Sequence, residues 1–206
     1  MDNSVSIAAA GAIPLLVVLL QSGTDVTKGN AAGALGNLSV NVDNKVSIAA
    51  AGAIALLVAL LQNGTDVAKG EAAAALRNLS AKNVDNMVSI AAAGAIPLLV
   101  VLLQSGTDVA KGNAAGALLN LSLNNDNKVS IAAAGAIPPL VALLQNGTDV
   151  AKEMVTITLR NLSTNEDNRV SIAAAGAIPR LVALLQNGTA RAKAQATQTL
   201  RVLSYA

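Results

Sequence analysis

The sequence contains no cysteine and no histidine, and Tyr205 is its single aromatic residue. A chain without these residues has no disulfide, no thiol or imidazole catalyst, and few of the ligands that dominate zinc sites. It also lacks the aromatic rings that stack on nucleic-acid bases. We therefore expect a core of Ala, Val, Leu and Ile, and a protein without a metal or cofactor.

Charge is also scarce. Charged residues make up 13% of the 206 positions, and 14 basic and 12 acidic side chains leave a net charge of +2. The basic residues are too few and too scattered to predict binding to nucleic acid or to an anionic membrane.

The longest apolar run, Ile90 to Leu103, has 14 residues, which is too short for a membrane span. Near the N-terminus the same motif follows "MDN", which lacks the basic residues of a signal peptide. We expect a cytoplasmic or recombinant protein with neither a signal peptide nor a transmembrane segment.

What the sequence has instead is repetition. The motif "AAAGAI" occurs five times, and its glycines are separated by 41, 42, 41 and 41 residues: Gly11, Gly52, Gly94, Gly135 and Gly176. The one-residue insertion falls between Ser80 and Asp85. A period of this length is typical of helical repeat proteins. We predict one solenoid over residues 1–206, with repeats near 1–41, 42–83, 84–124, 125–165 and 166–206.

Each repeat divides into three predicted helices. In the short first helix, Asp43 or Asn44 is placed to cap the N-terminus and Gly52 to end the helix. The apolar second helix ends at a glycine such as Gly106, and the third begins at a capping threonine such as Thr107. Because the second helix is apolar on almost all sides, each repeat needs neighbours to cover it. The pattern predicts an all-α fold, a right-handed α-α superhelix of three-helix repeats.

The motif "AGAIPLLVVLLQSG" followed by "NAAGALLNLS" resembles the armadillo repeat, and the resemblance covers all five units. The amino-acid sequence of the motif is most similar to armadillo repeats of plant or algal type. Repeats 1 and 3 share "AGAIPLLVVLLQSGTDV" without a difference, which indicates an engineered or artificially assembled, consensus-like chain. The insertion near Lys82 and the divergent "KEMVTITLRNLS" of the fourth repeat then indicate a natural template.

An enzyme is not predicted. The acidic residues recur once per repeat at helix starts, as Asp25, Asp66 and Asp108 do, which suits helix capping better than a convergent catalytic pair. The glycines do not form the "GxxxxGK[ST]" motif of a phosphate-binding loop.

An asparagine recurs inside the apolar "LxNL" near the end of the third helix. It occupies four positions: Asn37, Asn78, Asn120 and Asn161. Its amide can bond to a carbonyl of its own or the next helix and stabilise the stack. The resemblance to armadillo proteins implies a second role, in which the third helices line a concave groove and the asparagines clamp the backbone of an extended peptide. An amide suits this role because it both donates and accepts a hydrogen bond.

Other groove positions depart from the best-known peptide-binding armadillo proteins. Seven residues before the asparagine, further candidate contacts are Asn30, Glu71 and Asn113. The tryptophan that the resemblance implies four residues before the asparagine is replaced at every repeat: Gly33, Ala74, Gly116, Ile157 and Gln198. Without these rings the cation–π slots for Lys and Arg are missing. The predicted partner is therefore an extended peptide or protein segment of unidentified sequence.

The two ends of the predicted solenoid differ. The last repeat carries polar residues at positions that are mainly small or apolar elsewhere: Arg180, Arg191, Lys193, Gln195, Gln198, Thr199 and Arg201. The first repeat keeps the apolar second helix, and the residues expected to lack a neighbour are Leu15, Val17, Val18 and Leu19. Exposed apolar patches mark association sites. We predict a homodimer that joins two N-terminal faces, with head-to-tail stacking as the less favoured arrangement. The alternative to a peptide binder is thus an engineered structural scaffold without a natural ligand that associates through this face.

Overall fold

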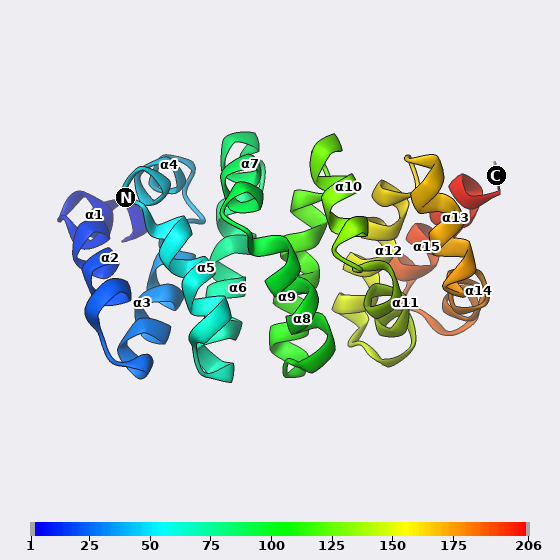
Figure 1. Ribbon diagram of the computed structural model, residues 1–206, viewed down its shortest axis with the longest axis horizontal. Coiled ribbons are helices and arrows are strands. Elements are labelled where there is room, and N and C mark those ends of the chain that lie inside the picture. Colours follow the sequence, from blue (N-terminus) through cyan, green and yellow to red (C-terminus); the bar gives the residue numbers. More distant parts are fainter. Residues whose placement is uncertain (1–2, 205–206) are drawn as a thin grey trace.

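The computed structural model describes residues 3–204, which form fifteen α-helices in five consecutive sets of three (Figure 1). The first helices of the repeats are α1 (Asn3–Ala9), α4 (Val42–Ala50), α7 (Val84–Ala92), α10 (Asn125–Ala133) and α13 (Glu166–Ala174). The second helices are α2 (Ala12–Ser22), α5 (Ala53–Asn63), α8 (Ala95–Ser105), α11 (Ile137–Asn146) and α14 (Ala177–Asn187). The third helices are α3 (Asp25–Leu38), α6 (Asp66–Ser80), α9 (Asp108–Leu121), α12 (Asp149–Leu162) and α15 (Ala190–Leu203). The described residues contain no strand, and the all-α prediction is confirmed.

Local sequence sets the helix boundaries. Thr107 caps α9 as predicted, because its side chain accepts a hydrogen bond from the backbone N–H of Ala110 at 3.2 Å. Gly52 separates α4 from α5 in the left-handed conformation, with φ of 80°, which a residue with a Cβ adopts only at a cost. The predicted cap of α4 was wrong. Asn41 caps this helix, and its Oδ1 accepts from the backbone N–H groups of Asp43 and Asn44 at 3.0 and 3.1 Å.

The third helices form the inner layer of the solenoid. Successive third helices pack against one another more extensively than successive second helices do. Their contact surfaces are rich in alanine, and Ala72, Ala73, Ala114 and Ala115 are fully buried. Small side chains let helix backbones approach closely. Because the third helices pack more extensively, we expect the stack to curve toward them.

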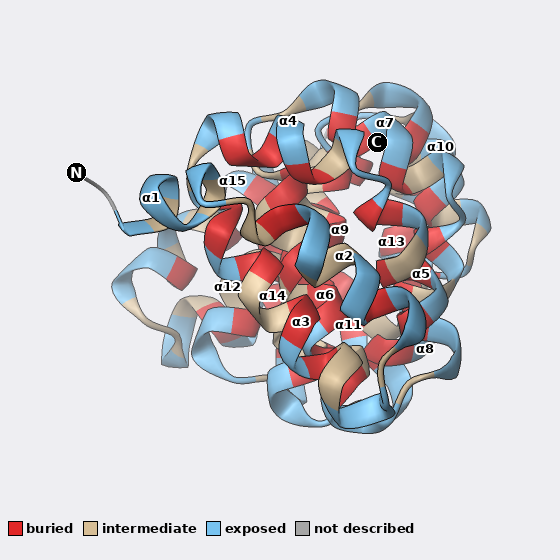
Figure 2. Ribbon diagram, turned by 90° about the vertical axis from the view of Figure 1, so that its left-hand side faces the viewer, coloured by how far each residue is buried: buried red, intermediate tan, exposed pale blue. Residues whose placement is uncertain are grey.

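A single aliphatic cluster runs through all five repeats. Its most buried members recur at the same repeat positions, as Ile48 and Ile90 do in the first helices and Leu57 and Leu99 in the second helices, all with no exposed surface. Figure 2 looks along the stack from its N-terminal end and shows buried segments in the interior and exposed segments around it. The predicted core of aliphatic residues is confirmed for the described residues.

The one-residue insertion produces a local irregularity between α6 and α7. Lys82 has a φ of 56°, and it is the only non-glycine residue with positive φ among the described residues. The neighbouring carbonyl of Ala81 accepts a hydrogen bond from Nζ of Lys45, whose side chain is largely buried. Burial lowers the pKa of Lys45 below its ordinary value, and the positive charge of Lys82 lowers it further.

Candidate peptide-binding groove

Three of the four recurring asparagines bind the preceding repeat. Nδ2 of Asn78 donates to the carbonyl of Gly36 at 2.9 Å, and Nδ2 of Asn120 donates to the carbonyl of Arg77 at 2.8 Å. Nδ2 of Asn161 instead donates to Oγ of Ser122 at 3.0 Å. These hydrogen bonds join consecutive third helices. They support the interpretation of the asparagines as links within the stack.

The same bonds leave part of each amide unused. Within residues 3–204, Oδ1 of Asn78, Asn120 and Asn161 accepts no hydrogen bond, although all three side chains are partly exposed. An amide oxygen can accept two hydrogen bonds. The asparagines thus combine a fixed nitrogen with an available oxygen. Asn37 is exposed, because no repeat lies before it in the described structure.

The candidates seven positions earlier are in two different environments. Nδ2 of Asn113 donates to the carbonyl of Gly70 at 3.2 Å, and its Oδ1 accepts from Nη1 of Arg77 at 3.2 Å. Asn113 therefore lies in the seam between α6 and α9. Glu71 and Asn30 are exposed.

Arginine and methionine side chains stand where the armadillo resemblance implies a tryptophan. A Cβ atom at Gly116 would overlap the side chain of Arg77 and approach Sδ of Met154 to 3.2 Å. Sequence analysis missed Arg77 and also Arg160, which donates to Gln195 and Gln198 of the next repeat. The available signal was the residue directly before each recurring asparagine, which is an arginine in the second and fourth repeats.

A pocket of about 240 Å³ lies between α9 and α12 on this side of the stack. Arg77, Asn113 and Met154 line it together with Val109 and Val150, whose side chains are 74% and 60% exposed. The equivalent valines of the first two repeats, Val26 and Val67, are also exposed. The third helices thus present polar amides near their C-terminal ends and a row of exposed valines near their N-terminal ends.

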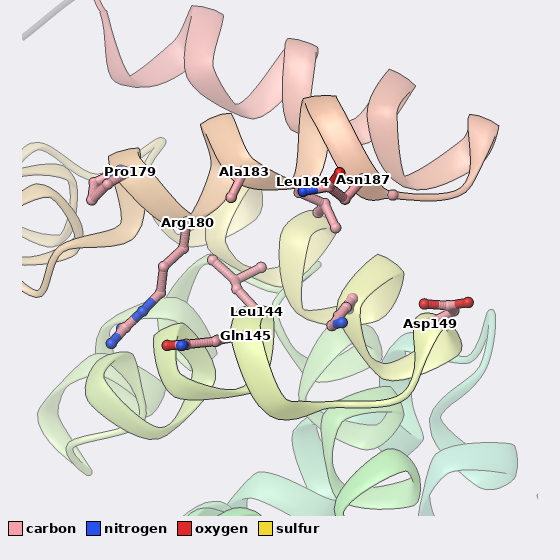
Figure 3. Close-up of a pocket in the computed structure, with 10 residues that line it drawn as sticks. Leu144, Gln145, Asp149, Pro179, Arg180, Ala183, Leu184 and Asn187 are labelled. Carbon is pink, nitrogen blue, oxygen red and sulfur yellow. The ribbon is translucent and has the colours of Figure 1, made fainter.

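A larger pocket of about 490 Å³ lies elsewhere, between the second helices α11 and α14 (Figure 3). Arg180 extends from α14 toward the preceding repeat and lies beside Gln145, while Asp149 lies at the other end of the pocket. Arg180 therefore faces the fourth repeat. This corrects the prediction that it belongs to a polar C-terminal face.

Other residues predicted for that face also point back toward the fourth repeat. Nε of Arg191 pairs with Oε2 of Glu153 at 3.4 Å, and Oγ1 of Thr199 donates to the carbonyl of Thr156 at 3.1 Å. The prediction was wrong for these residues because composition alone does not show which side of a helix they occupy. The residues that the last repeat exposes at this end include Ile178 and Val182, at 42% and 43%.

The first repeat exposes a smaller set of apolar residues than predicted. Leu15 and Leu19 are 66% and 41% exposed, and with Ile7 they line an apolar pocket of about 480 Å³. Val17 is half-buried and packs against the core, so it does not belong to this surface. Val18 is 55% exposed, but its equivalent in the third repeat, Val101, is 56% exposed. Its exposure is therefore unrelated to its place in the first repeat.

Residues 3–204 contain no group of three acidic residues placed to hold a metal ion. In the same range no single helix is long and apolar enough to cross a membrane. The first and second helices of a repeat reach that length and apolarity only when the two are counted as one segment, and all 5 such pairs are sharply bent where the two helices meet.

The repeats match a known family. The model of the armadillo/beta-catenin-like repeat matches residues 2–40, 41–81, 84–123, 124–164 and 165–205. These matches cover almost the whole sequence, and the chain belongs to the armadillo repeat family. No curated protein matches it in sequence.

Solved structures of designed armadillo repeat proteins are similar along nearly the whole chain. One designed armadillo repeat protein has a TM-score of 0.91 and 28% identity, and the match covers 98% of this chain and 86% of that one. A second, in complex with the peptide (KR)4, has a TM-score of 0.88 and 26% identity over 98% and 86% of the two chains. A third, computationally designed for modular peptide recognition, has a TM-score of 0.90 and 27% identity over 98% and 86%. This likeness agrees with the interpretation of the near-identical repeats as an engineered chain.

Proposed function

We propose that this chain is a non-catalytic interaction scaffold that holds an extended peptide or protein segment along its third helices. The observation that carries the proposal is the constant placement of Asn78, Asn120 and Asn161, each with its nitrogen bound to the preceding repeat and its oxygen unused. A fixed amide presents an acceptor to a peptide N–H without paying the entropy of ordering its own side chain. The designed armadillo repeat protein in complex with (KR)4 and the one designed for modular peptide recognition support the same role.

The repeat distance suits an extended chain. Packed helices lie about 8–10 Å apart, and the inner side of a curved stack is at the lower end of this range. Two residues of an extended strand span about 6.6 Å. Each repeat would therefore read two peptide residues, with one amide oxygen for each pair.

The arginines beside the ladder asparagines favour an acidic partner at that part of the groove, whereas Glu71 and Asp108 lie farther from the asparagines along the third helices. Arg77 and Arg160 lie next to the ladder asparagines, and each guanidinium has five N–H donors. Arg77 uses a donor on Asn113, and Arg160 uses donors on Gln195 and Gln198. The two arginines are two repeats apart, which corresponds to about four residues of extended chain at two residues per repeat. A carboxylate-bearing peptide of eight residues would span both.

Fluorescence anisotropy with labelled octapeptides tests this proposal. We expect an alternating Glu–Thr peptide to bind at least tenfold more tightly than (KR)4 at low salt, because like charges repel. The double variant R77A/R160A should lose this preference. The matched control R180A, which removes an arginine between the second helices, should retain it. Equal affinities of the parent for both peptides would contradict the acidic preference.

A second candidate function is a structural scaffold without a ligand, in which the asparagines only link repeats. The bonds of Asn78 and Asn120 to the preceding helix favour it. A library of extended peptides separates the two candidates. Binding that the double variant N78A/N120A loses, at a temperature where both proteins are folded, supports the groove. Failure of the parent to bind any member leaves the structural role.

A further inference from the structure

The first repeat exposes residues that every inner junction covers. Ile7 in the first helix is 48% exposed, whereas the equivalent isoleucines of repeats 2–5 have no exposed surface: Ile48, Ile90, Ile131 and Ile172. Leu19 in the second helix is 41% exposed, whereas the equivalent leucines of repeats 2–5 are 5–6% exposed: Leu60, Leu102, Leu143 and Leu184. The preceding repeat covers these side chains in repeats 2–5. The N-terminal surface is therefore an acceptor for the C-terminal side of an armadillo repeat.

The last repeat exposes the opposite side of the same junction between repeats. Ile178 is 42% exposed and Val182 is 43% exposed, while the same positions of the fourth repeat, Ile137 and Val141, are 5% and 0% exposed. In inner repeats these residues pack against the repeat that follows. Two of the arginines predicted for this face point elsewhere, since Arg180 lines the pocket toward the fourth repeat and Arg191 pairs with Glu153. Arg201, at the repeat position of Arg160, is exposed at this end.

Polar groups at the two ends also match. Asn120 donates to the carbonyl of Arg77 and, at 3.3 Å, to Oγ of Ser80, and Asn161 donates to Oγ of Ser122. The same positions are Asn37 in the first repeat and Arg201 and Ser204 in the last. Asn37 and Ser204 are both exposed. Joining the two ends would add one more rung of the ladder.

We propose that the C-terminal face of one copy of this chain docks on the N-terminal face of a second copy, so that the solenoid continues from one molecule to the next. The interface repeats a junction that the chain already makes four times. A two-fold dimer of N-terminal faces would bury Leu15 and Leu19 but would leave Ile178 and Val182 exposed and offer Asn37 no helix-end carbonyl. The two ends lie at opposite sides of the stack (Figure 1), so this contact is heterologous and does not close on a single molecule.

Two face-specific variants distinguish the proposal from a two-fold dimer. Leu15→Glu places a charge on the N-terminal face and leaves the C-terminal face intact, and Val182→Glu does the reverse. Sedimentation velocity over a hundredfold range of concentration should show the parent exceeding twice its monomer mass of 20.4 kDa. Each variant alone should remain a monomer. An equimolar mixture should form a dimer, because one intact face of each kind remains.

The matched control is Leu123→Glu, which adds the same charge at a leucine that is 59% exposed in the middle of the stack. It should assemble as the parent does. Circular dichroism verifies that each variant is folded, and Ile178→Glu replaces Val182→Glu if the latter is not. A parent that stays monomeric at every concentration overturns the proposal. A Val182→Glu or Ile178→Glu protein that dimerises alone overturns it in favour of the two-fold arrangement.

Discussion

Asn120 donates a hydrogen bond to the backbone carbonyl of Arg77, 2.8 Å away on the preceding third helix. Asn78 makes the same bond to Gly36, and in both cases the acceptor is the residue directly before the previous asparagine of the series. Two adjacent positions of the repeat therefore supply the donor and the acceptor of the link. This explains why asparagine is tolerated beside core leucines, since its polar group is satisfied by the adjacent repeat.

The first prediction concerns this link. Asn120→Ala should lower the free energy of unfolding by about 1–2 kcal/mol, because a partly buried hydrogen bond is lost and its acceptor is less well satisfied. Asn37→Ala removes the same side chain where the described chain provides no preceding helix, so the change should stay within about 0.5 kcal/mol. Urea unfolding of dilute protein measures both. Equal losses would contradict the assignment of the ladder as a link between repeats.

The repeat period made the fold predictable. Five copies of the glycine motif at constant intervals determine helix number, order and stacking, and Gly52 and Thr107 have the conformation and the cap that their residue types predict. The capping of α4 was missed because three polar residues compete for it, Asn41, Asp43 and Asn44, and only Asn41 precedes the first turn.

Contacts between repeats were less predictable. Arg191 and Thr199 were assigned to an exposed end because they replace small residues, yet both contact the fourth repeat. A linear pattern gives the period of a helix but not the direction of each side chain in a stack that curves. The partners of Asn78 and Asn120 lie 42 and 43 residues earlier, and only their three-dimensional register brings them together.

The second prediction concerns Lys45. Its pKa is lowered by burial and then by Lys82, so the folded chain binds this proton more weakly than the unfolded chain does. Stability should therefore rise with pH between the lowered pKa and the ordinary value of 10.5. Lys45→Met should flatten this rise, and Met87, 3% exposed at the same position of the third repeat, indicates that methionine fits. Urea unfolding at several alkaline pH values measures the slopes, and identical slopes for parent and variant would contradict the prediction.

The third prediction concerns the insertion. Lys82 has a φ of 56°, a conformation that costs an L-residue about 1–2 kcal/mol. Lys82→Gly should remove that strain and raise the free energy of unfolding by up to about 1 kcal/mol, after the greater entropy loss of glycine is deducted. Lys82→Ala is the control, because it removes the charge and keeps the strain. Both variants should raise the pKa of Lys45 toward its ordinary value, but only the glycine variant should be more stable by this mechanism.

The last prediction compares two glycines inside third helices. A Cβ at Gly112 would have no atom within 4 Å, so Gly112→Ala should stabilise α9 by about 0.5–1 kcal/mol through helix propensity alone. A Cβ at Gly36 would lie 3.2 Å from Cα of Ala75 on α6. The two helices would have to separate by a few tenths of an ångström, against the 2.9 Å hydrogen bond from Asn78 to the Gly36 carbonyl. We therefore expect Gly36→Ala to be no more stable than the parent in urea unfolding. If it gained as much as Gly112→Ala, the α3–α6 junction would have to yield easily, and the close approach of the third helices would contribute little to the curvature of the stack.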